Sequence, residues 1–128
     1  QRAEFNAQGV SNMLWALAKM KEVQPDLVSQ LCSQACHKSP EFNAQGVSMT
    51  LWALAKMEQQ RPDLVNKQHQ ADLVNKLCSQ LCSQSAEFKA QVISNTLWAL
   101  AKMKQVQPEL VNKLCSQACH KSAEFNAQ

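Results

Sequence analysis

Hydrophobic residues recur along the chain with the spacing of amphipathic helices, and polar residues fill the opposite faces. In residues 7–20, an angle of about 100° per residue gathers the apolar side chains in one broad arc. Residues 25–38 carry a second apolar arc after a break at residues 23–25. The pattern predicts one helix over each range. The first arc comprises Val10, Met13, Leu14, Leu17, Ala18 and Met20, and the second comprises Leu27, Val28, Leu31, Cys32, Ala35 and Cys36.

Residues at the predicted helix starts support these boundaries. Asn6 precedes the first helix, where its side chain can accept a hydrogen bond from a backbone N–H of the first turn. Pro25 suits the first position of the second helix, because a proline has no N–H to leave unpaired there. Acidic residues occupy equivalent first-turn positions after a proline, where they interact favourably with the helix dipole. These acids are Asp26, Asp63 and Glu109.

The two-helix pattern is repeated along the chain. The dipeptide Glu-Phe begins at residues 4, 41, 87 and 124, and residues 4–40 match residues 87–123 at 28 of 37 positions. One hairpin of this size cannot bury both apolar arcs, whereas stacked hairpins can. We therefore expect an all-α fold, an α-solenoid of 37-residue helical hairpins. The expected units are repeat 1 over 4–40, repeat 2 with a nine-residue insertion over 41–86, repeat 3 over 87–123 and the start of a fourth repeat over 124–128, as in a fragment of a longer array.

The insertion in repeat 2 is visible as a stutter, since the sequence Asp-Leu-Val-Asn-Lys occurs at both 63–67 and 72–76. A continuous helix from residue 62 to residue 83 would turn Leu64 and Val65 to the face opposite their second copies. Two alternatives follow. Either residues 68–71 break the helix, or Leu64 and Val65 protrude and contact a partner protein.

Composition limits the possible classes of protein. The chain has 128 residues, of which 45% are hydrophobic and 18% are charged, as in one folded domain and unlike a disordered tail. A net charge of +3 is compatible with a nucleic-acid partner but does not require one. No window holds the roughly 18 apolar residues of a membrane span, so we expect no membrane insertion.

The polar face of the first helix carries residue types that can bind RNA. Amides can contact base edges, a tryptophan can stack on a base, and a lysine can neutralise a phosphate. The predicted RNA-binding residues are Gln8, Asn12, Lys19, Gln45, Lys56, Gln91, Asn95 and Lys102. Met49 replaces the asparagine in repeat 2, so a uniform base code fails there. For Trp15, Trp52 and Trp98 we favour packing between repeats, and a merely solvated face remains an alternative for the lysines.

Cysteine pairs four residues apart lie on each second helix, at Cys32/Cys36, Cys78/Cys82 and Cys115/Cys119. Zinc needs four converging ligands, usually from short loops, whereas these sulfurs occupy a row where small hydrophobic residues are expected. We expect packing roles, no metal and no cofactor. Six thiols without a disulfide-scaffold pattern suit a reducing compartment. There is no glycine-rich phosphate loop in the sequence, and we expect no catalytic residue and no enzyme.

The block Leu-Trp-Ala-Leu-Ala-Lys-Met occurs at 14–20, 51–57 and 97–103, and in repeat 1 it follows Phe-Asn-Ala-Gln and Val-Ser-Asn. This block resembles the heptatricopeptide and octotricopeptide repeats, and the 37-residue period fits the former. The resemblance implies an αα superhelix that acts in mitochondrial or chloroplast RNA metabolism, sometimes within a ribonucleoprotein such as an organellar ribosome. The implied partners are single-stranded or ribosomal RNA and proteins of a larger complex. Bacterial effector proteins carry similar repeats, which leaves the compartment open. The alternative function is a protein–protein interaction scaffold without RNA contact.

Overall fold

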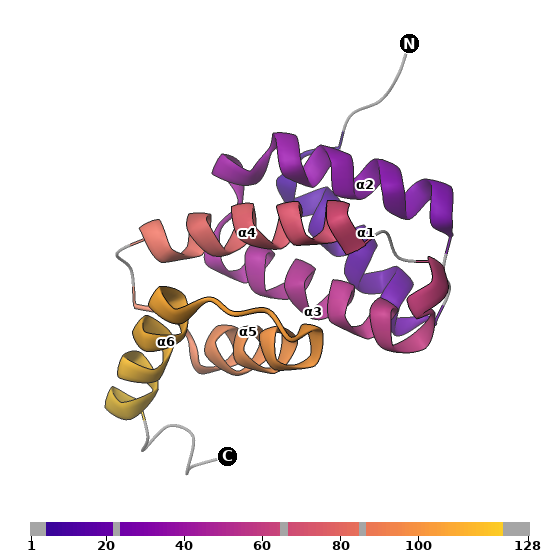
Figure 1. The fold of residues 1–128 in the computed structure, drawn as a ribbon. Coiled ribbons are helices and arrows are strands. Elements are labelled where there is room, and N and C mark those ends of the chain that lie inside the picture. Colours follow the sequence, from indigo (N-terminus) through magenta and orange to yellow (C-terminus); the bar gives the residue numbers. More distant parts are fainter. Residues whose placement is uncertain (1–4, 22–23, 65–66, 85–86, 122–128) are drawn as a thin grey trace.

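The computed structural model describes residues 5–21, 24–64, 67–84 and 87–121. This part of the chain consists of α-helices, two short 3-10 helices (η) and connecting segments, and contains no strand, which confirms the all-α prediction. The elements in chain order are α1 Ala7–Lys19, α2 Pro25–His37, η1 Ser39–Glu41, α3 Ala44–Gln60, η2 Pro62–Leu64, α4 Lys67–Ser83, α5 Ala90–Met103 and α6 Pro108–His120 (Figure 1).

The helices are arranged in two layers (Figure 1). In the first layer, α3 lies between α1 and α5, and the three helices run in the same direction. In the second layer, α4 contacts both α2 and α6, and α6 is steeply inclined to α4 in this view. Each first-layer helix also packs on the second-layer helix that follows it in the chain. The α3–α4 hairpin is therefore the inner one, with α1–α2 and α5–α6 at the two ends.

One hydrophobic core fills the space between the layers and between neighbouring hairpins. The apolar arcs of the first-layer helices face this core, as amphipathic helices do. Side chains of all six α-helices contribute to it. The largest fully buried side chains are Phe42, Phe88, Leu14, Leu31, Leu51, Met57, Leu73, Leu77, Leu81, Ile93, Leu110 and Leu114.

Met20 corrects the predicted apolar arc of the first helix. It is 62% exposed and lies at the C-cap of α1, beyond the last helical residue. Its counterparts in the other hairpins, Met57 and Met103, are 1% and 6% exposed. Met20 lies beyond the last residue of α1, whereas Met57 and Met103 lie within α3 and α5, which pack against each other. The other members of the arc are buried or half-buried: Val10, Met13, Leu14, Leu17 and Ala18.

The helix starts agree with the local signals in the sequence. The Asn6 side chain accepts a hydrogen bond from the Gly9 N–H at 2.8 Å, and Asn43 repeats this cap on the Gly46 N–H at 2.7 Å. The third repeat has Lys89 at this position, whose side chain makes no capping bond. α2 and α6 both begin at a proline.

The inner hairpin takes up the nine inserted residues in a regular way. α3 and α4 each have 17 residues, whereas α1 and α2 each have 13. Each inner helix is thus longer by four residues, or about one turn, and the connection between them is longer by one residue. Residues 68–71 lie inside α4, so the alternative in which they break the helix is wrong. The side chain of Leu64 and all of Val65 lie outside the described residues, so their predicted partner contact stays a prediction.

The end hairpins differ from the inner one in how the first helix stops. Lys21 and Lys104 occupy equivalent positions after α1 and in the C-cap of α5, with left-handed φ values of 58° and 55°. The equivalent residue in the inner hairpin is Glu58, which continues α3. A left-handed conformation costs a non-glycine residue about 1 kcal/mol. The added turn of α3 therefore replaces a strained bend with regular helix.

None of the described helices is both long enough and apolar enough to cross a membrane.

Candidate functional site

The outer side of the first layer carries three indole rings in a row. The ring centroids of Trp15 and Trp52 are 6.2 Å apart with a 35° angle between planes, and those of Trp52 and Trp98 are 6.2 Å apart with a 33° angle. Such tilted pairs are favourable for aromatic quadrupoles. Together with the lysines four residues further on, these rings form what we call the Trp–Lys ladder: Trp15, Trp52, Trp98, Lys19, Lys56 and Lys102.

The lysines of the ladder bridge neighbouring repeats. Lys19 Nζ lies 5.4 Å from the Trp15 centroid and 5.7 Å from the Trp52 centroid. Lys56 Nζ lies 5.6 Å from Trp52 and 5.7 Å from Trp98, and the last lysine lies 5.8 Å from the ring of its own repeat. These distances are within the roughly 6 Å of a cation–π contact. Each bridging ammonium group is thus positioned by two rings.

The burial of the tryptophans fits packing between repeats, but at the surface and not in a closed core. Trp52 and Trp98 are half-buried and pack against the core, while Trp15 at the end of the row is 38% exposed. The lysine side chains lie along the rings, so a nucleobase must displace them to stack on an indole. The rings therefore act mainly as supports that hold the row of positive charges.

The predicted amide residues lie nearer the starts of the same helices. Gln8, Asn12, Gln45 and Gln91 are exposed, and Asn95 is half-buried. Two of these amides are already joined, since Gln91 Nε2 donates to Asn95 Oδ1 at 2.9 Å. The eight predicted residues occupy equivalent positions on the polar faces of α1, α3 and α5. Since these three helices run in the same direction, the eight residues lie on one side of the first layer.

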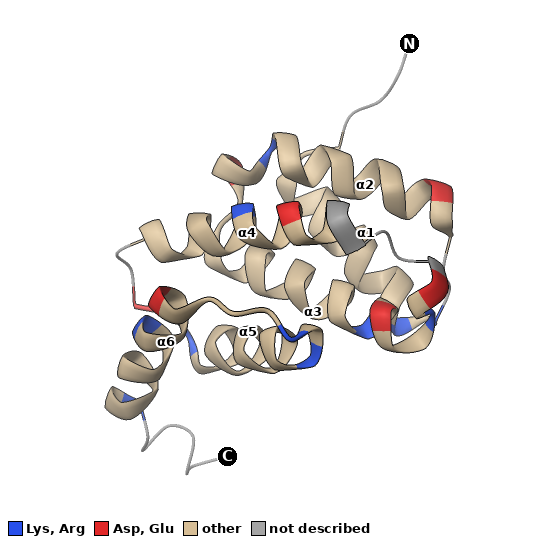
Figure 2. Cartoon of the chain, viewed as in Figure 1, with Lys and Arg blue, Asp and Glu red and all other residues tan. Residues whose placement is uncertain are grey.

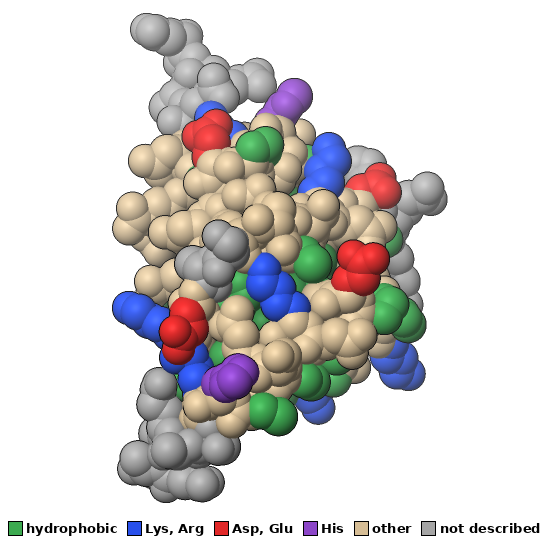
Figure 3. Space-filling model, turned by 90° about the vertical axis from the view of Figure 1, so that its left-hand side faces the viewer, with side chains coloured by type: hydrophobic (Ala, Val, Ile, Leu, Met, Phe, Trp, Pro, Cys, Tyr) green, Lys and Arg blue, Asp and Glu red, His purple; other side chains and the backbone are tan. Residues whose placement is uncertain are grey.

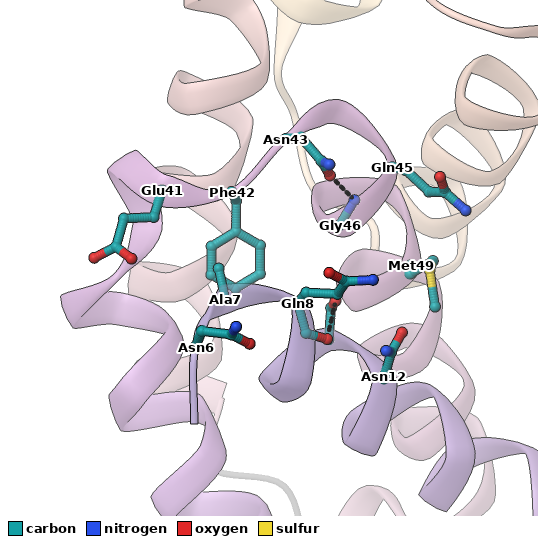
Figure 4. Close-up of a pocket in the computed structure, with 11 residues that line it drawn as sticks. Asn6, Ala7, Gln8, Asn12, Glu41, Phe42, Asn43, Gln45, Gly46 and Met49 are labelled. Carbon is teal, nitrogen blue, oxygen red and sulfur yellow. Dashed lines mark hydrogen bonds between the residues drawn. The ribbon is translucent and has the colours of Figure 1, made fainter. Parts of the chain in front are cut away.

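A groove of about 340 Å³ separates the starts of α1 and α3. Gln8 and Asn12 from α1 and Gln45 and Met49 from α3 lie around it, and Glu41 contributes a carboxylate at its other edge (Figure 4). Amides of both helices thus surround one hollow, in which they can donate to and accept from a planar polar ligand. The methionine side chain adds an apolar, adaptable contact.

Positive charge gathers at the other end of the layer. Blue segments cluster where α1, α3 and α5 end, at the lower right of Figure 2. The cluster is not purely basic, because Glu58 lies with Lys102 and Lys104 around a second hollow of about 330 Å³. Asp63 also forms an exposed ion pair of 3.5 Å with the Arg61 guanidinium. The ladder lysines are therefore the regular part of a mixed surface.

A glutamine on each second-layer helix forms a hydrogen bond with the backbone just before a first-layer helix. This role was not predicted from the sequence. The Phe5 N–H donates to Gln34 Oε1 at 3.3 Å, and the Phe88 N–H donates to Gln117 Oε1 at 2.6 Å. The equivalent Gln80 instead donates its Nε2 to the carbonyl oxygen of Phe42 at 3.0 Å. The recurrence of Ser-Gln in the repeats was the only signal available. These glutamines position the starts of the first-layer helices.

A lysine adds a further link between the last two hairpins. Lys113 Nζ donates to the carbonyl oxygens of Cys82 and Gln84 and lies 5.3 Å from the Phe88 ring centroid. At the end of α6, Lys121 pairs with Glu87 at 2.8 Å, and this hydrogen bond lowers the pKa of the Glu87 carboxyl. Both contacts anchor α6, which packs on α4 and α5.

The cysteines differ in exposure along the chain. Burial, with a smaller effect of the neighbouring thiols Cys36 and Cys82, raises the pKa of Cys32 and of Cys78 to about 12. Both thiols are therefore protonated at neutral pH, which makes them poor nucleophiles and poor metal ligands. Cys115 and Cys119 are exposed. Within the described part of the chain, no three His, Cys, Asp or Glu side chains converge to hold a metal ion.

Comparisons with protein-family models, with curated proteins and with solved structures give no match for this chain.

Proposed function

We propose that the chain is part of an α-solenoid of 37-residue hairpins that binds single-stranded RNA along the Trp–Lys ladder. The observation that carries the proposal is the regular row of ammonium groups, one in each repeat, on rings that are 6.2 Å apart. This spacing is close to that between successive phosphates of an extended single strand. A row of cations that tracks a phosphate backbone is the usual basis of binding without sequence preference.

The ladder favours binding in two ways. Its lysines can neutralise phosphates and release counterions. Since Lys19 and Lys56 each lie against two rings, their side chains lose less conformational freedom when a phosphate arrives than free lysines do. The amides of Gln8, Asn12 and Gln45 then lie on the same side of the layer, where they can contact base edges.

The resemblance to heptatricopeptide and octotricopeptide repeats supports the same proposal and suggests the cellular process in which the protein acts. Proteins of that kind act in mitochondrial or chloroplast RNA metabolism, in some cases within an organellar ribosome. Three ladder lysines provide about three phosphate contacts, and affinity that depends on so few contacts is low at physiological salt. We therefore expect weak binding by these 128 residues, with contacts to ribosomal RNA or to proteins of a larger complex adding to it.

A specific observation favours the second candidate, a protein-interaction scaffold without RNA contact. The indole faces are already occupied by lysine side chains, and the carboxylate of Glu58 lies with Lys102 around one hollow. In that case the ladder serves only to join neighbouring repeats.

A salt series distinguishes the two candidates. The affinity for single-stranded RNA is measured at several salt concentrations for the wild type and for the triple variant Lys19→Gln, Lys56→Gln, Lys102→Gln. RNA binding along the ladder predicts that log affinity falls with log salt, and that the triple variant flattens the slope by about 0.7 per lost contact, or about 2 in total.

The matched control removes the same charge elsewhere, in the variant Lys38→Gln, Lys76→Gln, Lys89→Gln. An equal loss of slope in this control would show that only net charge matters. Absence of binding at low salt by every variant would favour the scaffold.

A further inference from the structure

A hollow of about 330 Å³ opens where α3 and α5 end and α4 begins. It is surrounded by residues of these three helices and of the segment that follows α5: Glu58, Gln70, Lys102, Met103, Lys104 and Gln105. Lys102 is also the last lysine of the Trp–Lys ladder, with its Nζ 5.8 Å from the Trp98 ring centroid. The hollow therefore adjoins the proposed path of the RNA backbone.

A buried amide positions the carboxylate of this hollow. Gln70 is 7% exposed, and its Nε2 donates to Glu58 Oε2 at 3.2 Å and to Met103 Sδ at 2.9 Å. The Gln70 Oε1 is buried without a hydrogen-bond partner among the described residues, so the bonds of Nε2 set the orientation of the amide. Glu58 is half-buried and is held through one of its two carboxylate oxygens. The other oxygen can accept a hydrogen bond from a ligand.

The nine inserted residues bring this carboxylate and this amide together. At the position of Glu58, the other two repeats have a lysine, which follows α1 in one case and caps α5 in the other. Gln70 corresponds to Gln24 and Gln107, the N-caps of α2 and α6. In the inner hairpin the second helix begins earlier, so Gln70 lies inside α4 and is buried. The added turns of α3 and α4 thus create a Glu–Gln pair whose acid the other two repeats lack.

A carboxylate near lysines is not by itself a binding site. On the side of the molecule that Figure 3 shows, acidic side chains also lie near basic ones. Glu58 differs because a buried amide holds its carboxylate at a hollow that a ladder lysine shares. A fixed negative charge beside a phosphate path repels nucleic acid. Such a charge favours binding only if the strand donates a hydrogen bond to it.

We propose that Glu58 accepts a hydrogen bond from the 2′-hydroxyl group of the nucleotide whose phosphate contacts Lys102, and that the protein thereby binds RNA in preference to DNA. RNA has this donor and DNA lacks it, and it adjoins the 3′-phosphate of the same nucleotide. The lysine and the carboxylate of one hollow thus match the phosphate and the hydroxyl of one ribonucleotide. Gln70 is a positioning residue that acts through Glu58. This inference rests on the proposed binding of RNA along the Trp–Lys ladder.

Binding to short uridine homopolymers with three different sugars tests the proposal. The sugars are ribose, deoxyribose and 2′-fluoro-ribose, and the base and the phosphates are the same in all three strands. The 2′-fluoro group keeps a ribose-like sugar conformation but cannot donate a hydrogen bond. The wild type is expected to bind the ribose strand at least about fivefold more tightly than either other strand at low salt, because a hydrogen bond to a charged acceptor is lost in those strands.

Two variants test the residues involved. Glu58→Met removes the acceptor and keeps a long side chain that favours helix, so it is expected to bind all three strands with equal affinity. Gln70→Met keeps the carboxylate but removes the amide that positions it. It is expected to lose most of the preference for ribose while the slope of log affinity against log salt stays unchanged, and a thermal melt checks that it folds. The matched control Asp72→Asn removes the charge of an exposed carboxylate on α4 and should keep the full preference.

The possible failures are distinguishable. Equal, salt-dependent binding of the ribose and deoxyribose strands by the wild type would overturn this proposal but leave binding along the ladder intact. A 2′-fluoro strand bound as tightly as the ribose strand, a preference retained in Glu58→Met, or a preference lost in Asp72→Asn would each overturn it as well. Failure of all three strands to bind at low salt would refute binding along the ladder, and this proposal with it.

Discussion

The inner hairpin, α3–α4, and the end hairpin α1–α2 contain many of the same residue types but bury them to different extents. Phe42 and Met57 are enclosed, whereas Phe5 and Met20 at the equivalent positions face solvent. The inner helices are also a turn longer. At the position equivalent to Lys21, the left-handed residue that follows α1, α3 continues as regular helix. The difference shows that burial here depends on whether a neighbouring hairpin covers that side of the residue and not on the residue itself, because Phe88 and Met103 of the α5–α6 hairpin are also buried. The α1–α2 hairpin therefore leaves exposed two residue types that the inner hairpin buries.

The largest expected effect concerns equivalent core leucines. Leu51 of the inner hairpin is fully buried, and its counterpart Leu97 is only half-buried. Leu51→Ala is expected to lower the free energy of unfolding by about 3 to 4 kcal/mol, because it leaves a cavity. Leu97→Ala is expected to cost about 1 kcal/mol, because that site loses less buried area. Urea unfolding at low protein concentration measures both. Equal losses would show that the end hairpin is covered in solution or that the burial contrast is wrong.

The sequence predicted the all-α class and the first two helices because these signals are local. Apolar spacing gave helices over 7–20 and 25–38, close to the observed α1 and α2, and Asn6 and Pro25 marked their starts. The position of the inserted residues could not be predicted in this way. Their split into an added turn on each inner helix depends on tertiary contacts such as that of Gln70 Nε2 with Glu58 Oε2 at 3.2 Å.

The helix face that carries the candidate site could be predicted from the sequence. The contacts between neighbouring helices within the site could not. A spacing of four residues places each lysine on the same side of its helix as the tryptophan. That a lysine also reaches the tryptophan of the next repeat depends on how closely neighbouring helices pack. The glutamines that hold the helix starts were missed for the same reason, since the partner of Gln34 is a backbone N–H 29 residues away.

A smaller change in the free energy of unfolding is expected for substitutions near the C-terminal ends of the first-layer helices. Lys21→Gly is expected to raise the free energy of unfolding by up to about 1 kcal/mol, because glycine adopts the left-handed conformation without strain. Glu58→Gly at the equivalent inner position is expected to lower it by about 1 kcal/mol or more, because glycine is unfavourable in a helix and the bond from Gln70 is lost. Thermal melts measure both changes. The control Lys21→Ala keeps the Cβ and should give no gain, and a gain equal to that of glycine would refute the strain.

The most direct test of the proposed RNA-binding face is an NMR titration with single-stranded RNA at low salt. The indole N–H signals of the ladder and the side-chain amides of Gln8, Gln45 and Gln91 report on the outer side of the first layer. The backbone signals of exposed residues on α2, such as Ser29 and Ser33, report on the second layer. We predict that the ladder and amide signals shift together and saturate, while the α2 signals stay in place. Shifts confined to the second layer, or no shifts at all, would contradict RNA binding along the Trp–Lys ladder.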